Sequence, residues 1–464
     1  MPNIGLAYLI SSVERKHAVR LIDTTFHVKD YKEYILKKIN GFHPDVVGFS
    51  TTTFNFQNSL KIARFIKEAI PDPDVRFIWG GVHPTLVAEE TLAESAVDAI
   101  CIGEGEVSFL AYLDKIEARQ QPHDVEGIWF KDEQKNIVKN RLRPFIQDLD
   151  SLPFPDWDYF ETDKYLEFSR RGFMFLASRG CPFSCTFCSS PSVGRLIPGK
   201  YYRTRSPESV IKEIKIVKRQ YPNIKFEHIY FGDETFGLDA QQFKGICGLF
   251  QREETLLGVT WSCETRADIV TEEWAKAASE SRCTLVKLGI ESADEYIRNQ
   301  VYKKSITDDD IKNAVKYLRK YKIEYIFLVL LGSYKESEAS ISKNLELLKA
   351  YDPLSCYIFI YCPTPGTELY DVTKKALLDS GISKKWDKNE LPAPVLLLPL
   401  NSIIWRFRML KLNLFLKHGF RLRRVHFILD IIFVFINWML LRGIDLNVKF
   451  KSLQRSRKIC SDKM

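Results

Sequence analysis

The sequence has little of what marks a secreted or membrane-spanning protein. Ten cysteines in 464 residues are too few for a disulfide scaffold. The first residues lack the basic segment and apolar run of a signal peptide. The apolar run at residues 425–441 is interrupted by Asp430, and it is shorter than the roughly 20 residues that a spanning helix needs. We therefore expect a cytoplasmic protein with reduced cysteines.

Negative charge is scarce at the carboxyl-terminal end. Residues 401–464 hold fourteen Lys and Arg against three Asp, so their net charge is +11. Since the net charge of the whole chain is +8, residues 1–400 have a net charge of −3. A nearly neutral body argues against a nucleic-acid partner. Basic residues flank the apolar run of the tail, as in helices that lie in a membrane interface. We expect peripheral membrane contact through this tail, with a helical lid on the rest of the chain as the alternative.

Hydrophobic periodicity predicts an α/β protein with two folded domains. In residues 1–115, apolar runs alternate with helical patterns, as in a doubly wound parallel sheet of the Rossmann or flavodoxin type. The expected strands are residues 19–23, 45–50, 75–79 and 98–102, and the expected helices are residues 5–14, 31–39 and 54–69. Residues 116–170 predict a connector with a hairpin (127–130 and 137–138) and a Pro-rich linker (152–157).

The alternation resumes in residues 171–380 and predicts a partial (β/α)6 barrel. Its six expected strands are residues 173–178, 228–231, 259–263, 285–290, 325–331 and 356–361. The loops that follow these strands would form the functional face of the barrel. Residues 381–464 are the basic, amphipathic helical tail.

Three cysteines, Cys181, Cys185 and Cys188, follow the first barrel strand with the spacing C-x3-C-x2-C. Three thiolates can bind three irons of a [4Fe–4S] cluster and leave the fourth iron open to a cofactor or substrate. The alternative is structural zinc, which needs four ligands. The next cysteine, Cys247, is distant and lies in a helical pattern. The motif therefore predicts an iron–sulfur site.

This motif resembles the signature of the radical S-adenosylmethionine (SAM) superfamily, with Phe187 at the aromatic position before the last cysteine. The resemblance implies that SAM chelates the open iron through its amino and carboxylate groups. It also implies that an electron from a donor such as flavodoxin or ferredoxin cleaves SAM to methionine and a 5′-deoxyadenosyl radical.

Further matches to the superfamily end the later barrel strands, at residues 231–236, 261–268, 288–292 and 362–368. The cofactor-binding residues expected in this domain are Phe187, Gly232, Asp233, Glu234, Glu264, Arg266 and Glu291. By resemblance, the segment with Glu234 binds the methionine amino group and Glu291 meets the ribose. Arg266 could pair with the SAM carboxylate in a fork. The alternative for Arg266 and Glu291 is a structural ion pair.

The first domain resembles the cobalamin-binding domain that precedes the barrel in one subgroup of this superfamily. The matching segments are residues 4–9, 20–23, 48–50, 80–84 and 103–106, and the expected cobalamin contacts are Ser50, Thr51, Gly80, Gly81, His83, Gly103 and Glu104. Glycines at strand ends let the backbone approach a large ligand. The alternative is a flavodoxin-like domain whose glycines only form tight turns.

Two departures from the subgroup pattern concern cobalamin. The D-x-H-x-x-G motif that supplies a histidine to cobalt elsewhere is missing, because the segment from Asp23 to His27 does not fit it. We therefore expect cobalamin with an unligated lower face and His83 near its nucleotide tail. The chain also starts at the helix of residues 5–14, where the subgroup has a preceding strand, so we expect a misassigned start or a sheet lacking its first strand.

These resemblances imply cobalamin-dependent methylation of an unactivated carbon in a small-molecule or lipid-like substrate. Radical ring closure or rearrangement is one alternative. A non-catalytic protein that senses cobalamin or redox state is another. The sequence singles out no catalytic side chain beyond the cofactor-binding residues.

Overall fold

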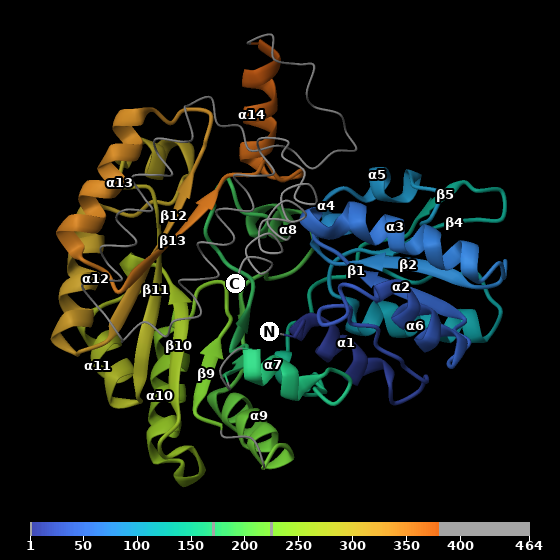
Figure 1. Cartoon of the computed structure of the whole chain (residues 1–464), viewed down its shortest axis with the longest axis horizontal. Helices are drawn as coiled ribbons and strands as arrows, with labels where there is room; N and C mark the ends of the chain where they lie inside the picture. The colour runs from blue at the N-terminus through green and yellow to red at the C-terminus, as the bar shows by residue number, and fades with distance from the viewer. Residues whose placement is uncertain (1, 169–171, 223–225, 380–464) are drawn as a thin grey trace, which may run out of the picture.

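The computed structural model describes residues 2–168, 172–222 and 226–379. These residues form two α/β units that lie side by side, with the amino-terminal unit in blue and the second unit from green to orange (Figure 1). The predicted tail, residues 381–464, lies outside the described residues. Within the described part, every helix is too short or too polar to cross a membrane.

The first unit is built on a five-stranded sheet in the order β1-β2-β3-β4-β5. Its strands are β1 (Val46–Ser50), β2 (Arg76–Gly80), β3 (Ala99–Cys101), β4 (Ile128–Lys131) and β5 (Ile137–Lys139). Its helices are α1 (Ile4–Val13), α2 (Tyr31–Asn40), α3 (Thr53–Ala69), α4 (Val82–Leu86), α5 (Ala88–Ala93) and α6 (Gly105–Glu117).

Alternating side chains of β2 place helices on both faces of this sheet. Phe77 and Trp79 are buried in one core with α2 and α3. Ile78 points the other way, into a second core with Tyr112 of α6. Two opposite apolar faces require two layers of helices, which confirms the predicted doubly wound arrangement.

The sheet is mixed, however, where the prediction was a wholly parallel sheet. β1, β2 and β3 are parallel, but β4 pairs antiparallel with β3 and β5 pairs antiparallel with β4. The predicted hairpin therefore extends the first sheet. The Pro-rich segment at residues 152–157 contains no helix or strand, as expected.

The predicted strand at residues 19–23 is wrong, because this segment is irregular. Its apolar side chains divide between the two units: Leu21 packs against the barrel core and Ile22 against the first core. The Asp23 carboxylate accepts a hydrogen bond from the Tyr165 hydroxyl at 2.6 Å. Among the described strands, β1 pairs with β2 alone, so its outer edge is left unpaired, and the segment crosses between the units instead of adding a strand there.

The second unit is the predicted partial barrel of six parallel strands, in the order β13-β12-β11-β10-β9-β6. Its strands are β6 (Gly172–Phe175), β9 (His228–Phe231), β10 (Thr260–Thr265), β11 (Cys283–Glu291), β12 (Glu324–Leu331) and β13 (Ser355–Ile360). Its helices are α9 (Pro207–Gln220), α10 (Ala240–Arg252), α11 (Glu272–Glu280), α12 (Asp308–Lys320) and α13 (Glu338–Tyr351), and they lie along the outer side of the strands (Figure 1).

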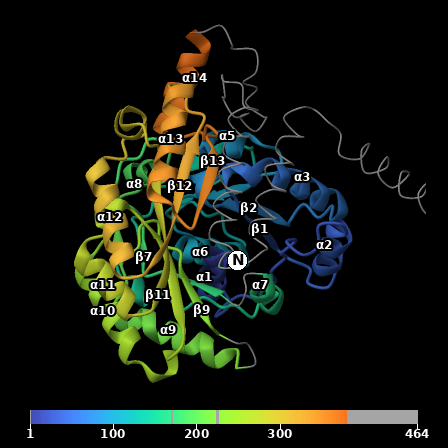
Figure 2. The same cartoon turned by 60° about the vertical axis from the view of Figure 1, so that its left-hand side comes forward.

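Short elements connect the two units. They are α7 (Thr162–Phe168), the antiparallel ribbon of β7 (Ser178–Arg179) and β8 (Arg203–Thr204), α8 (Ser190–Leu196) and α14 (Glu368–Asp379). α4, which follows the carboxyl end of β2, contacts α8 at the boundary between the units (Figure 1). The amino-terminal unit, in blue, also lies against the second unit in the turned view (Figure 2). A Cβ atom on Gly366, after β13, would lie 2.7 Å from the Cβ of Leu86 in α4. The functional edges of the two sheets therefore face each other.

Candidate functional site

The three predicted cluster cysteines lie on one loop, residues 180–189, which we call the cysteine loop. It leaves β7 through Gly180, whose φ is +83°. A Cβ atom there would lie 2.4 Å from the Tyr201 carbonyl oxygen. Only glycine combines this left-handed backbone with so close an approach, so Gly180 fixes the direction in which the loop starts.

The middle of the cysteine loop is fastened to the far side of the barrel. The Thr186 amide donates to the Tyr302 carbonyl at 3.0 Å, and the Thr186 hydroxyl donates to the Val301 carbonyl at 2.7 Å. The ring of Phe187, the predicted aromatic residue, meets Tyr302 edge-on at 5.3 Å. These contacts hold the loop between the first and fourth strand ends.

All three cysteines are partly accessible, and their charges interact. Burial raises the pKa of the Cys185 thiol, while the nearby Lys304 and Arg266 oppose that rise. Burial raises the pKa of Cys188 to about 11, and negative charge on Cys185 and Cys181 adds to the rise. A thiol whose pKa is raised in this way ionises when a metal cation binds to it, and iron would be that cation when a cluster binds.

The sulfur positions do not suit a single metal ion. Among the described residues, only one set of three or more His, Cys, Asp or Glu side chains has all its ligand atoms within 4.8 Å of one another, and it consists of His17, Asp114 and Glu117. The three cysteine sulfurs are therefore spaced more widely than this. One zinc ion about 2.3 Å from each sulfur would hold any two sulfurs within about 4.6 Å. A cubane places each sulfur on a different iron and allows wider spacing. The His17 group is explained by ion pairs, since its two ring nitrogens face different carboxylates and Lys16 also pairs with Asp114.

The segment after β9 lies against the cysteine loop. Thr235 Oγ1 is 3.7 Å from Cys181 Sγ. Glu234 remains exposed to solvent, yet the surrounding protein raises its pKa, an effect that a hydrogen bond from the Gly180 amide opposes. The carboxylate thus combines solvent access with partial desolvation by its neighbours. Glu234 is therefore accessible to a cationic group bound beside the cysteines.

Its two predicted neighbours, Gly232 and Asp233, have structural roles. A Cβ atom on Gly232 would lie 2.6 Å from Met174 Sδ of β6. The Asp233 carboxylate is buried and accepts hydrogen bonds from the Ala177 amide and the Ser178 hydroxyl. Burial raises the pKa of Asp233 to about 7. These contacts brace the junction from which the cysteine loop departs.

Arg266 ends β10 with a guanidinium that is 4% exposed. Its Nε and Nη2 donate to the two carboxylate oxygens of Asp268, and Nη2 also donates to the Lys304 carbonyl. The ion pair considered as the alternative is thus present. Its third nitrogen, Nη1, is buried and has no partner among the described residues. A buried guanidinium nitrogen without an acceptor fits an anionic ligand group.

Glu291 ends β11 in a left-handed conformation with a φ of +65°, next to a break in register against β12. Its carboxylate accepts from Lys304 at 2.8 Å, and both side chains are nearly buried. Strain of this kind on a non-glycine residue is concentrated at functional sites. Lys304 was not among the residues predicted from the sequence, because it follows a π-helical turn and belongs to no recognisable motif.

Glu264 belongs to a polar group on the inner side of the barrel. Its Oε1 accepts from the Tyr230 hydroxyl at 2.7 Å and from Lys287 at 2.9 Å. The Lys287 ammonium also lies 4.3 Å from the centre of the Tyr230 ring. Three adjacent strands, β9, β10 and β11, thus contribute one side chain each.

The predicted cobalamin contacts gather at the carboxyl edge of β1–β3. Gly81 has a φ of +99°, and a Cβ atom there would lie 2.5 Å from the Thr51 carbonyl oxygen. The Gly103 amide donates to the Thr85 hydroxyl, which donates to the Gly81 carbonyl. The turns at this edge, which includes Ser50 and Gly80, are therefore packed closely against one another, and at Gly81 only glycine permits that packing.

His83 lies behind that edge. Its Nδ1 is 3.1 Å from Thr53 Oγ1, and its ring packs 4.0 Å from the ring of Phe56. Burial lowers the pKa of His83 to about 4. The imidazole is therefore neutral at physiological pH.

Glu104, also predicted to contact cobalamin, is held by arginines of the second unit. Arg179 and Arg203 donate to its two carboxylate oxygens at 3.0 and 2.8 Å. Neither Arg179 nor Arg203 was among the residues predicted from the sequence. No local signal links these residues, because their sequence separations from Glu104 are 75 and 99.

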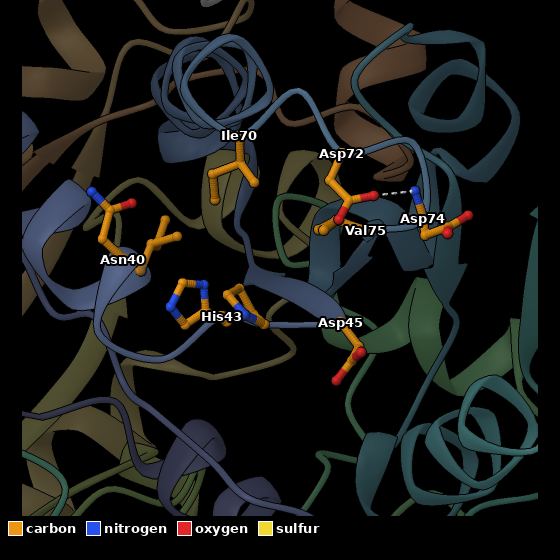
Figure 3. A pocket seen from close by; sticks show the side chains of 9 residues that line it. Asn40, His43, Asp45, Ile70, Asp72, Asp74 and Val75 are labelled. Carbon is orange, nitrogen blue, oxygen red and sulfur yellow. Dashed lines mark hydrogen bonds between the residues drawn. The ribbon is translucent and has the colours of Figure 1, made fainter.

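A separate small pocket, of about 170 Å³, lies at the amino-terminal ends of β1 and β2 (Figure 3). His43, Asp45, Asp72 and Asp74 contribute to its lining. Ligands of doubly wound sheets bind at the opposite, carboxyl ends of the strands. This pocket is therefore not the candidate site.

An α/β domain facing a partial barrel, with three cysteines at the carboxyl ends of the barrel strands, defines an iron–sulfur enzyme with room for a second cofactor. Known domain families agree with this class. The B12 binding domain matches residues 1–113, and the Radical SAM superfamily matches residues 175–348. An uncharacterized methyltransferase of Pyrococcus horikoshii is 30% identical over 437 residues, which cover 91% of this chain and 92% of that protein.

Solved structures show the same fold. TsrM of Kitasatospora setae, a radical SAM methyltransferase solved with tryptophan substrate and the SAM analogue aza-SAM, has a TM-score of 0.67 at 18% identity, covering 87% of this chain and 78% of that one. The cobalamin-dependent radical SAM enzyme OxsB, solved with aqua-cobalamin and SAM, has a TM-score of 0.64 at 22% identity, covering 86% and 56%.

The chain therefore belongs to the radical SAM superfamily, in the group whose barrel is preceded by a B12-binding domain. It is a radical SAM enzyme, and methyltransferases are among its relatives. The cofactors of this group are a [4Fe–4S] cluster, SAM and cobalamin.

Proposed function

We propose that this enzyme methylates an unactivated carbon of a small molecule, with cobalamin as methyl carrier and SAM as radical source. The observation that carries the proposal is the contact between the two functional edges, where Glu104 after β3 meets Arg179 before the cysteine loop at 3.0 Å. A cofactor on either edge would lie next to the other. Methyl transfer to a carbon radical requires both cofactors to reach one substrate atom.

Cys181, Cys185 and Cys188 would hold the cluster, with Phe187 packing the loop against the barrel. The chemistry supplied by the bound group is one-electron cleavage of SAM by a reductant, which yields a radical able to abstract hydrogen from carbon. The protein's own contribution is to position the reacting groups and to keep water and stray protons out.

Three charged side chains would orient SAM beside the cysteine loop. Glu234, whose side chain is exposed to solvent, can accept hydrogen bonds from the methionine ammonium. Arg266 offers its unpaired Nη1 to the carboxylate. Glu291, held by Lys304 through one oxygen, keeps the other available to ribose hydroxyls.

The carboxyl edge of the first sheet would take cobalamin. Ser50, Gly81 and Gly103 lie at this edge, and Phe54, at the start of α3, is 57% exposed beside it and could contact the corrin. The neutral imidazole of His83 lies behind this edge, where it would support the binding surface.

The test is an anaerobic reconstitution of the full chain with iron, sulfide and cobalamin, followed by SAM with a deuterated methyl group and dithionite. We expect 5′-deoxyadenosine and label on cobalamin. With a fraction of small metabolites added, we expect a product that carries the intact labelled methyl group. The Cys188→Ala variant is the negative control. Cleavage of SAM without any label on cobalamin would exclude this function.

A further inference from the structure

Two arginines of the barrel unit hold one carboxylate of the B12-binding unit. Arg179 Nη1 lies 3.0 Å from Glu104 Oε1, and Arg203 Nη1 lies 2.8 Å from Glu104 Oε2. Arg179 Nη2 also pairs with Glu106 at 2.7 Å. All four side chains are at most 18% exposed. Two positive and two negative charges thus neutralise one another in a nearly dry contact.

The position of these arginines in the chain gives the contact its significance. Arg179 ends β7, directly before the cysteine loop, and Arg203 begins β8, directly after the segment that contains this loop and α8. β7 and β8 pair with each other, with Arg179 opposite Arg203. Both ends of the cluster-bearing segment are therefore fastened to the same carboxylate of the other unit.

Further hydrogen bonds fix the orientation of the Glu104 and Arg203 side chains. The Ile146 amide donates to Glu104 Oε2 at 2.7 Å, and the Ile146 carbonyl accepts from Arg203. Arg203 Nε also donates to the Tyr201 carbonyl. Burial alone would raise the pKa of Glu104, but the hydrogen bond from Arg203 and the charges of both arginines bring it below its ordinary value. Glu104 therefore stays ionised at neutral pH.

We propose that Glu104 is a positioning residue that acts through Arg179 and Arg203 and sets the distance between the bound cobalamin and the cluster. This role rests on the proposed function and replaces the predicted contact of Glu104 with cobalamin. Gly103, in the loop after β3, lies at the edge where cobalamin would bind. Glu104 is the next residue, so it can fix the position of this edge relative to the cysteine loop. Removing the charge would leave the buried Arg203 guanidinium without a carboxylate and Arg179 with Glu106 alone, which frees the two units to shift.

The test measures the separation of the two cofactors in the full, doubly loaded chain. Limited dithionite gives cob(II)alamin and the reduced cluster, which are both paramagnetic, and pulsed electron paramagnetic resonance reports their dipolar coupling. We expect a sharp coupling in the wild type. In Glu104→Gln we expect the iron, sulfide and cobalamin contents and the separate spectra to persist while the sharp coupling is lost.

Glu94→Gln is the matched control. It removes the negative charge from another 3.0 Å ion pair, with Arg64, that lies wholly within the first unit, and we expect it to retain the wild-type coupling. If Glu104→Gln does not load both cofactors, Arg203→Lys is measured in its place. Lysine keeps the charge but cannot bind Glu104 and the two carbonyls together.

The outcomes separate this proposal from the proposed function. Wild-type protein that binds no cobalamin or builds no cluster would overturn the proposed function. A doubly loaded wild type with a sharp coupling that persists in the loaded variant would overturn the positioning role alone.

Discussion

The guanidinium carbon of Arg266 lies 3.5 Å from the centre of the Phe183 ring. This contact joins the end of β10 to the cysteine loop. Because Asp268 holds two nitrogens of Arg266 and Phe183 covers one face, the remaining nitrogen, Nη1, is fixed in direction. The same side chain therefore supports the loop that would hold the cluster and offers a donor beside it.

Replacing Arg266 with Lys should weaken SAM binding by about tenfold, or about 1.4 kcal/mol, because an ammonium cannot hold Asp268 and offer a second planar donor at once. Equilibrium dialysis of labelled SAM against reconstituted protein measures this change. Arg282→Lys is the control, since Arg282 binds backbone carbonyls near the opposite ends of the strands. Unchanged SAM affinity in Arg266→Lys would remove Arg266 from the SAM site.

Replacing Cys188 with Ala should abolish the cluster, because two thiolates would leave two irons without protein ligands. Iron and sulfide analysis and visible absorbance after anaerobic reconstitution measure the loss. Cys247→Ala is the matched control. Its side chain is buried in the core on α10, so this change should cost about 1 kcal/mol of stability and retain the full iron content. A cluster of normal content in Cys188→Ala would contradict the assignment.

The parts of the fold that sequence predicts well are those with local signals. The side-chain alternation at Phe77, Ile78 and Trp79 marks a strand covered on both faces, and the structure confirms it. The segment at residues 19–23 is also apolar, but its side chains divide between two cores, and pairing depends on distant residues. The hairpin is likewise visible locally, whereas its attachment to β3 is not.

The candidate site divides in the same way. The three cysteines were identifiable because eight residues contain them all and their residue type is rare. The partner of Glu291, Lys304, depends on a register break and a left-handed residue in β11, which no local pattern announces. Glu104 was identified by its place after β3, but its contacts with Arg179 and Arg203 arise only when two units pack together.

Replacing Gly81 with Ala should damage cobalamin binding more than its backbone strain alone explains. Alanine at a φ of +99° and a ψ of −174°, a region essentially confined to glycine, costs about 1–3 kcal/mol, and the added Cβ would also lie 2.5 Å from the Thr51 carbonyl oxygen. Gly258→Ala is the matched control, because Gly258 has a φ of +79° with nothing within 4 Å of the added atom. Urea unfolding and a cobalamin titration should show both variants destabilised and Gly81→Ala alone deficient in binding. Equal losses in the two variants would contradict a specific role for this edge.

The His83 ring should titrate far below an ordinary histidine. Burial lowers its pKa to about 4, from about 6.5 in the unfolded chain. The unfolded chain therefore binds the extra proton between these values, and stability rises with pH across that window. The contribution is complete above pH 6.5 and falls by about 3 kcal/mol as pH drops toward 4. Carbon-13 NMR of ring-labelled histidine, assigned with His83→Gln, measures the pKa directly.

His27 provides an internal control for that spectrum. A hydrogen bond with Glu161 at 2.9 Å raises the pKa of His27, so its signal should move at higher pH than that of an unperturbed histidine. The two rings are thus expected to shift in opposite directions in one sample, His83 because its charged form is desolvated and His27 because its charged form gains a carboxylate. A His83 signal that moves near pH 6.5 would mean that water reaches the imidazole, and the surface behind Gly81 would then be open rather than packed.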